Sequence, residues 1–183
     1  MKLDKKIKRH FDKKLYATIT RKTSKKSKEL SRGYILDFSD RFLLLQETDN
    51  FEAMGFNIFP KKIITKIRYN KNDIFYDKIM KLEGEKKKIK IRTKVKIKSW
   101  ESIFNSLKSV KRNVIVECEN PKFDIFTIGE ITKVTAKKVF IKYFNPEGVF
   151  DKKSTPVKFK NITKVQFDDR YIGVFSKYLR EAK

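Results

Sequence analysis

The chain has 183 residues, of which 37% are charged, and 46 basic residues outnumber 22 acidic ones for a formal net charge of +24. The 16 phenylalanines and 7 tyrosines supply enough apolar surface for a core, which excludes a wholly disordered chain. A single cysteine, Cys118, excludes an intramolecular disulfide framework, and a single histidine, His10, argues against a Cys/His zinc site, so we expect no metal and no cofactor. The longest aliphatic run is too short to span a membrane, and no apolar leader follows Met1, which favours a cytoplasmic protein.

The positive charge is concentrated in two segments. Residues 1–32 carry +10 and residues 84–112 carry +9, whereas residues 33–83 are neutral and residues 113–183 carry +5. Charge separated in this way favours a polyanionic partner such as nucleic acid or an anionic membrane. Lysine dominates the basic residues, and it suits salt-sensitive attraction to phosphates better than the reading of base edges.

The N-terminal segment, residues 1–13, is basic and has regularly spaced apolar residues. Leu3, Ile7, Phe11 and Leu15 lie four positions apart among lysines. This spacing fits either a basic amphipathic helix or a partly ordered arm. Residues 23–28 follow the first expected strand and have the composition of a polar, basic loop.

An internal repeat relates the two halves of the chain, with a register that drifts from 96 to 99 residues. Residues 33–39 match 129–135, and residues 64–69 match 162–167. Alternating apolar residues, with glycine and proline between them, predict about five short strands in each copy. A short helix is expected to close each copy, with Asn72-Asp73 and Asp168-Asp169 at the two N-caps.

These patterns predict a mainly β chain of two tandem small barrels, each closed by a short C-terminal helix. The first barrel is expected at residues 14–80 and the second at residues 113–183. A basic connecting strand and a helix are expected between them, at residues 81–112. The helix should begin after Ser99 as N-cap and direct Trp100, Ile103 and Phe104 toward the second barrel.

Residues 88–98 alternate strictly between basic and apolar side chains. As a strand, this segment would place six cations on one face. The face could follow a phosphate backbone, because a polyanion relieves the repulsion between neighbouring like charges and releases counterions. It could equally be a solvated face, or a sheet edge that its lysines protect from pairing.

The repeated pattern resembles the Sm-like small barrel, an SH3-like five-stranded fold. The resemblance rests on Gly33-x-Ile35-x-x-Phe38 and the later Ile64-x-x-Ile67, and it covers residues 14–80 and 113–180. With Phe126-x-x-Gly129-x-Ile131 in the second copy, the chain is also similar to uncharacterised bacterial tandem Sm-like proteins. The uridine pocket of Sm proteins is not carried over at any residue, so the resemblance implies architecture rather than activity.

Several other residues could carry chemistry. Exposed aromatic side chains could stack on bases, although most are expected to lie in the core. The paired acids Asp37 with Asp40 and Asp168 with Asp169 fit turn and capping roles, and Cys118 fits a small core residue. No catalytic or phosphate-binding motif is present, so we expect no enzyme. The loop aromatics in question are Phe51, Phe56, Tyr69, Tyr143 and Phe144.

The sequence therefore predicts a non-enzymatic, basic protein that binds nucleic acid through its phosphates. RNA is favoured, and association with the ribosome would satisfy the prediction. The residues expected to contact phosphate lie in the connecting segment and in the N-terminal segment: Lys88, Lys90, Arg92, Lys94, Lys96, Lys98, Lys5, Lys6, Lys8, Arg9, Lys13, Lys14, Lys25, Lys26 and Lys28.

Two alternatives stay open at this point. In the first, the two barrels form a protein-interaction module, the neutral residues 33–83 are the docking surface and the charge serves solubility. In the second, the basic N-terminal helix binds a membrane surface peripherally. The oligomeric state is not predicted.

Overall fold

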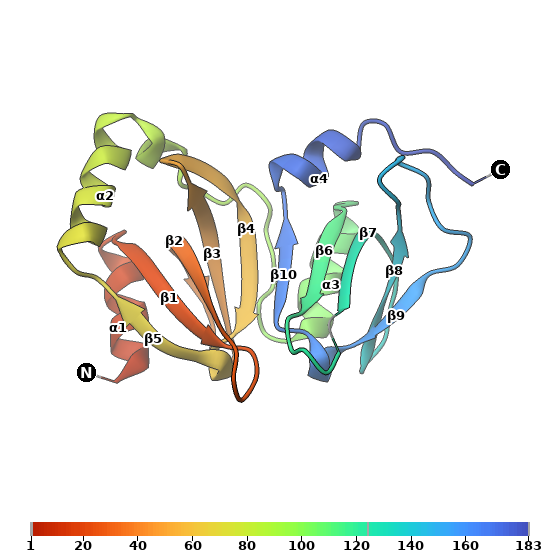
Figure 1. Ribbon diagram of the computed structural model, residues 1–183, viewed down its shortest axis with the longest axis horizontal. Coiled ribbons are helices and arrows are strands. Elements are labelled where there is room, and N and C mark those ends of the chain that lie inside the picture. Colours follow the sequence, from red (N-terminus) through yellow and green to blue (C-terminus); the bar gives the residue numbers. More distant parts are fainter. Residues whose placement is uncertain (1, 124, 183) are drawn as a thin grey trace. The chain divides into compact units, whose positions relative to one another are not determined.

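The computed structural model describes residues 2–123 and 125–182 (Figure 1). The prediction of a mainly β chain is confirmed. Contacts divide the chain into two compact units, the first ending at Arg92 and the second beginning at Thr93. The boundary falls within the segment expected to connect two barrels.

The first unit begins with a helix, continues as a sheet and ends with a second helix. Its strands are antiparallel, in the order β5-β1-β2-β3-β4. The helix α1 packs against β2 and β5, and α2 packs against β1. The elements are α1 (Leu3–Asp12), β1 (Tyr16–Lys22), β2 (Lys28–Phe38), β3 (Phe42–Asp49), β4 (Glu52–Pro60), the 3-10 turn η1 (Lys61–Ile63), β5 (Ile64–Arg68), α2 (Lys71–Leu82) and the 3-10 turn η2 (Glu85–Lys88).

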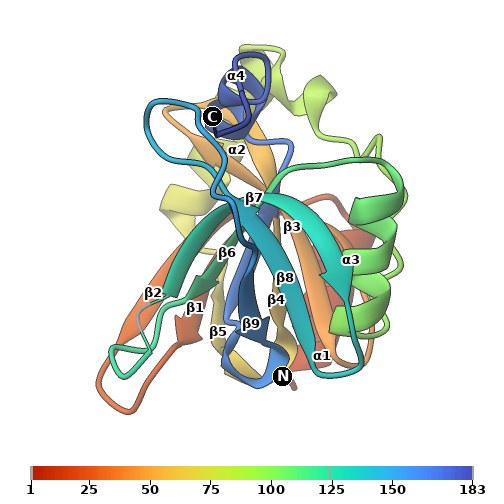
Figure 2. The ribbon, with the colours of Figure 1, turned by 90° about the vertical axis from the view of Figure 1, so that its right-hand side faces the viewer.

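The second unit repeats this order. Its strands are antiparallel and follow the order β10-β6-β7-β8-β9, and α3 lies against β7 and β8 (Figure 2). The elements are α3 (Trp100–Ser109), β6 (Val114–Cys118), β7 (Ile125–Val134), β8 (Lys138–Tyr143), β9 (Thr155–Lys158), the 3-10 turn η3 (Phe159–Asn161), β10 (Lys164–Phe167) and α4 (Arg170–Phe175).

Closure of each sheet into a barrel is not confirmed. Among the described residues, no pairing joins β5 to β4 in the first unit or β10 to β9 in the second, so each sheet is open. The short helix predicted at the end of each copy is confirmed in both units. Asp169 caps α4 as predicted, but the cap of α2 is Asn70, two residues before the predicted pair.

The repeat extends further than the sequence pattern indicated. Leu3 begins α1 and Trp100 begins α3, which is an offset of 97 residues, and both helices have 10 residues. The N-terminal segment is therefore a helix, and it occupies the place in the first unit that α3 occupies in the second. Ser99 caps α3 as predicted, and Trp100, Ile103 and Phe104 are buried.

One glycine in each unit permits a close approach of two strands. Gly33 in β2 and Gly129 in β7 have φ of +151° and +152°. A Cβ atom on Gly33 would lie 1.9 Å from the carbonyl oxygen of Gln46, and one on Gly129 would lie 1.9 Å from that of Lys142. Only glycine fits such a position. A register shift follows in each unit, one before Asp37 and one before Lys133, and it bends the strand.

Each unit has its own apolar core. In the first unit, Ile7 of α1 packs with β-strand residues that include Ile19, Leu43 and Phe59. In the second unit, Ile115 and Phe144 form a cluster with Ile172 of α4. Each core is therefore built from strand residues together with residues of a helix.

Candidate nucleic-acid interface

The predicted basic strand is not a strand. After η2 ends at Lys88, residues 89–99 form neither helix nor sheet. Side chains, rather than a neighbouring strand, bond the backbone of this segment. Gln46 Oε1 accepts from the N–H of Lys90 at 3.0 Å, and Ser106 Oγ accepts from the N–H of Lys96 at 3.1 Å. These hydrogen bonds attach the irregular segment to β3 at Lys90 and to α3 at Lys96.

The alternation of the sequence nevertheless produces an alternation of burial. Thr93 and Ile97 are 6% and 5% exposed, and Ile89 and Val95 are half-buried. Ile91 departs from the pattern and is exposed. The six predicted cations of this segment are all exposed to solvent: Lys88, Lys90, Arg92, Lys94, Lys96 and Lys98.

Most of these cations carry an unbalanced charge. Lys88 is ion-paired with Glu85, which raises the pKa of Lys88. Among the described residues, the other five have no ion pair. The first three cations belong to the first unit and the last three to the second. Each unit therefore contributes exposed positive charge from this part of the chain.

The helix α1 also presents cations, but its apolar side is already buried. Ile7 is fully buried and Leu3 packs against the same core. Lys6 is half-buried, and Lys8 is paired with Asp12 at 2.8 Å. The predicted cations of this region that are exposed are Lys5, Lys8, Arg9, Lys13 and Lys14. Phe11 is 38% exposed, so the core covers most of the apolar side of this helix and leaves one aromatic ring accessible.

The predicted basic loop at residues 23–28 joins β1 to β2. Lys25 and Lys26 are exposed in this loop, and so is Lys28, which is the first residue of β2. This loop lies at the opposite end of the first unit from η2, where the basic segment begins (Figures 1 and 2). The structure thus does not bring these lysines together with Lys88 and Lys90.

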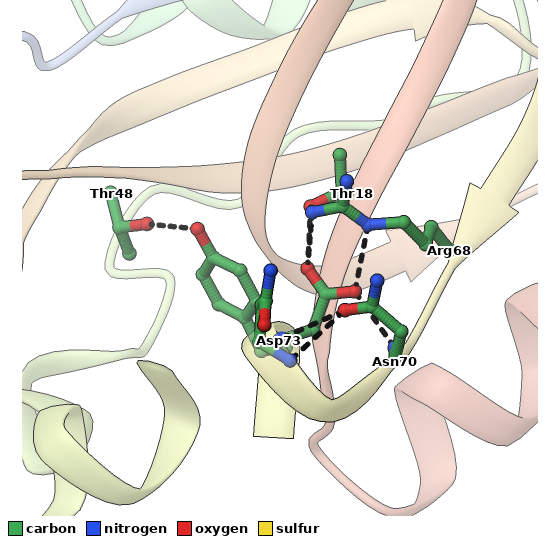
Figure 3. Close-up of polar contacts among 7 residues, drawn as sticks. Thr18, Thr48, Arg68, Asn70 and Asp73 are labelled. Carbon is green, nitrogen blue, oxygen red and sulfur yellow. Dashed lines mark hydrogen bonds and ion pairs between the residues drawn. The ribbon is translucent and has the colours of Figure 1, made fainter. Parts of the chain in front are cut away.

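Sequence reasoning missed a buried polar network where β5 meets α2 (Figure 3). The Asp73 carboxylate, 2% exposed, accepts hydrogen bonds from Arg68 at 2.9 and 3.0 Å and from the Thr18 hydroxyl at 2.8 Å. It also accepts from the Asn70 N–H, which completes a capping box at the start of α2. Burial raises the pKa of Asp73, but these hydrogen bonds outweigh it and hold the pKa below its usual value. The network therefore anchors α2 to the sheet.

His10 lies in the core rather than in a basic arm. Its side chain is 4% exposed, and its ring meets that of Tyr69 edge-on at 5.4 Å. Burial lowers the pKa of His10. The neutral form is therefore the one that the fold accommodates.

The five candidate aromatic residues fall into two groups. Phe56 and Phe144 are core residues, and Tyr69 and Tyr143 are half-buried. Phe51, in the turn between β3 and β4, is 38% exposed. It is therefore the most accessible ring of the five.

Side chains that could bind a metal are not gathered in the described part of the chain. Cys118 is buried, as predicted, and burial raises the pKa of its thiol to about 11. No cluster of three or more histidine, cysteine or acidic side chains that could hold a metal occurs within residues 2–123 and 125–182.

Comparisons with known protein families, with curated proteins and with solved structures found no match. The Sm-like resemblance therefore stays a prediction. Within the described residues, no helix has the length and apolar character needed to cross a bilayer.

Proposed function

We propose that the protein is a non-enzymatic nucleic-acid-binding protein that contacts phosphates through residues 88–98. The observation that carries the proposal is the exposure of all six cations of this segment, five of them without an ion pair among the described residues. Thr93 and Ile97 are buried, and the backbone at Lys90 and Lys96 is hydrogen-bonded, so the cations are presented by an attached backbone rather than by a free tail. Such a backbone loses less conformational entropy on binding than a free tail would.

RNA is the favoured ligand. Arg92 is the one arginine among the six cations, so bidentate reading of base pairs in a DNA groove has little support. Lysines instead track phosphates with little sequence preference. If five phosphates of a single strand are contacted, log K should fall with log salt at a slope of about −3.5. Association with the ribosome would agree with this proposal.

The test compares RNA binding by two variants of equal charge. In the first, Lys90, Arg92, Lys94 and Lys96 are changed to Gln. In the second, four exposed lysines of the second unit are changed to Gln instead: Lys137, Lys152, Lys153 and Lys160. Binding to single- and double-stranded RNA and DNA is measured by fluorescence anisotropy from 50 to 300 mM salt.

The first variant should bind RNA at least about tenfold more weakly, with a slope shallower by about 3, because four counterion-releasing contacts are lost. The control variant should lose much less affinity, since only the long-range attraction of its charges is removed. Equal losses in the two variants would contradict the proposal and leave binding to net charge alone.

A protein-interaction module is the second candidate function, and the outer face of α2 favours it. Ile74, Phe75 and Leu82 are 50%, 62% and 72% exposed on this helix of the neutral segment. Several exposed apolar side chains on one helix are typical of a surface that contacts a partner. This candidate predicts binding to a protein that persists at 300 mM salt and is lost when the three residues are changed to Ser.

We propose further that each unit is a variant of the Sm-like small barrel. The repeated strand order, the glycine in the second strand and the closing helix support this assignment. An experimental structure would test it, because closure of each sheet through its edge strands distinguishes a barrel from an open sheet.

A further inference from the structure

The turn between β3 and β4 contains a phenylalanine where glycine is preferred. Asp49 pairs with Glu52, so Asn50 and Phe51 form a two-residue hairpin loop. Their φ angles are +44° and +64°. Two positive φ angles are the pattern of a type I′ turn, whose second position favours glycine. A bulky side chain in this conformation is unfavourable.

The unfavourable backbone places Phe51 at the end of a column of aromatic rings. The N–H of Phe51 donates to the hydroxyl of Tyr76 at 2.9 Å, and the two rings stack at 4.5 Å and 22°. Tyr76 stacks on Tyr16 in turn, at 4.5 Å and 28°. Tyr16 is 2% exposed, whereas Phe51 is 38% exposed. The column therefore begins in the core and ends in water.

We infer that Phe51 is a stacking platform for a base of a single-stranded nucleic acid. The base would continue the column on the side of Phe51 that faces solvent. Every base has a π-face, so a platform of this kind binds single strands with little sequence preference. This inference rests on the proposed function and specifies its ligand as an unpaired strand.

Two basic residues lie beside the same hairpin. Glu85 accepts from the N–H of Ala53 at 3.2 Å and forms an ion pair with Lys88. Gln46 accepts from the N–H of Lys90 and donates to the carbonyl of Met54 at 3.2 Å. The start of the basic segment is therefore attached to β3 and β4, the strands that carry the turn.

The charges around the turn determine how a bound nucleic-acid strand would be oriented. The exposed carboxylates of Asp49 and Glu52 flank Phe51 and repel phosphate. A neutral base tolerates this position, whereas the phosphates are drawn toward Lys88 and Lys90. The expected arrangement is a base over Phe51 with its backbone on the lysine side.

The test uses a variant in which Phe51 is changed to Gly, with two anionic probes. One probe is a ten-nucleotide oligouridine, and the other is polyphosphate, which has charge but no bases. Gly relieves the backbone of the turn, and circular dichroism reports whether the variant folds. Affinity for oligouridine should fall about tenfold, the loss expected for one stacked base, while affinity for polyphosphate stays unchanged.

A second variant, Phe51 to Trp, keeps a ring at this position. It should bind oligouridine at least as tightly as the natural protein, and its added tryptophan fluorescence should be quenched by RNA but not by polyphosphate. If Phe51→Gly does not fold, Phe51→Leu replaces it, because leucine keeps apolar bulk without a ring.

The outcomes separate the inference from the proposed function. Unchanged oligouridine affinity in Phe51→Gly, or an equal loss for both probes, would overturn the stacking platform. If the variant with four Gln substitutions in residues 88–98 binds RNA as tightly as the natural protein, the proposed interface fails as well.

Discussion

The two units share one scaffold but attach their closing helices differently. Gly33 pairs with Ala17 and Gly129 pairs with Val114, so Thr18 corresponds to Ile115 by register. The N-caps Asn70 and Asp169 align the helices and make Asp73 correspond to Ile172. Where the first unit has a buried hydrogen bond between Thr18 and Asp73, the second has two isoleucines in one apolar cluster.

The same scaffold can therefore attach its closing helix either through a buried polar network or through apolar packing. The desolvation cost of a buried carboxylate must be offset by hydrogen bonds and a cation, and Arg68 supplies both. The apolar pair needs no such compensation. The first unit therefore gains a titratable group under α2, whereas the second has none at the corresponding position.

The largest expected effect tests the feature that the units share. Changing Gly33 or Gly129 to Ala places a Cβ atom 1.9 Å from a backbone oxygen, so each substitution should destabilise its own unit by at least about 3 kcal/mol. Trp100 is the only tryptophan and lies in the second unit, so its fluorescence during urea unfolding reports that unit. Gly129→Ala should shift this transition strongly.

Gly173→Ala is the matched control, because its added Cβ meets nothing within 4 Å and alanine favours a helix. The shared scaffold would be contradicted if Gly129→Ala and Gly173→Ala shifted the Trp100 transition equally.

The second effect tests the difference between the units. Asp73→Ile alone should cost the first unit about 2–3 kcal/mol, below the range for a fully buried pair because Arg68 is partly exposed. Adding Thr18→Ile and Arg68→Gln copies the second unit and should recover at least half of that loss. Hydrogen exchange of β1 and β5 measures the stability of the first unit. No recovery in the triple variant would mean that the two attachments are not interchangeable.

The smallest effect is a pH dependence confined to the first unit. The pKa of His10 is lowered by burial, so the unfolded chain takes up a proton first as the pH falls below about 6.5. The pKa of Asp73 is lowered as well, so its contribution is present at neutral pH and is lost below about pH 4. Amide protection factors, which correct for the slower intrinsic exchange at low pH, should therefore fall in the first unit before they fall in the second.

Leu107 corresponds to His10 in the second unit, so His10→Leu is the control. This variant should remove the loss of stability between about pH 6.5 and pH 5. An unchanged profile in His10→Leu would assign that loss to another group.

The sequence predicted most of the scaffold because its signals are local. Alternation, turn residues and the repeated glycine indicated the strands, and Ser99 indicated the start of α3. The match between α1 and α3 was hidden because lysines surround Ile7, whereas α3 has serines and aromatic residues around Phe104. The repeat is visible there only in the structure.

The candidate site was predicted in part. Alternation correctly indicated that the six cations of residues 88–98 face water, because it requires only an extended backbone, but it wrongly placed Ile91 on the buried side. It wrongly predicted a strand, because a strand also needs a partner, and Gln46 and Ser106 bond this backbone instead. The contact between Arg68 and Asp73 was missed because it crosses the junction of a strand and a helix.

Lysine footprinting with and without single-stranded RNA tests the central claim most directly. Exposed lysines are acetylated, and mass spectrometry compares their reactivity in the free and bound protein. We expect RNA to protect Lys90, Lys94, Lys96 and Lys98 several-fold more than Lys152 and Lys153, which are exposed as well. Equal protection of both sets, or stronger protection of Lys152 and Lys153, would show that residues 88–98 are not the interface.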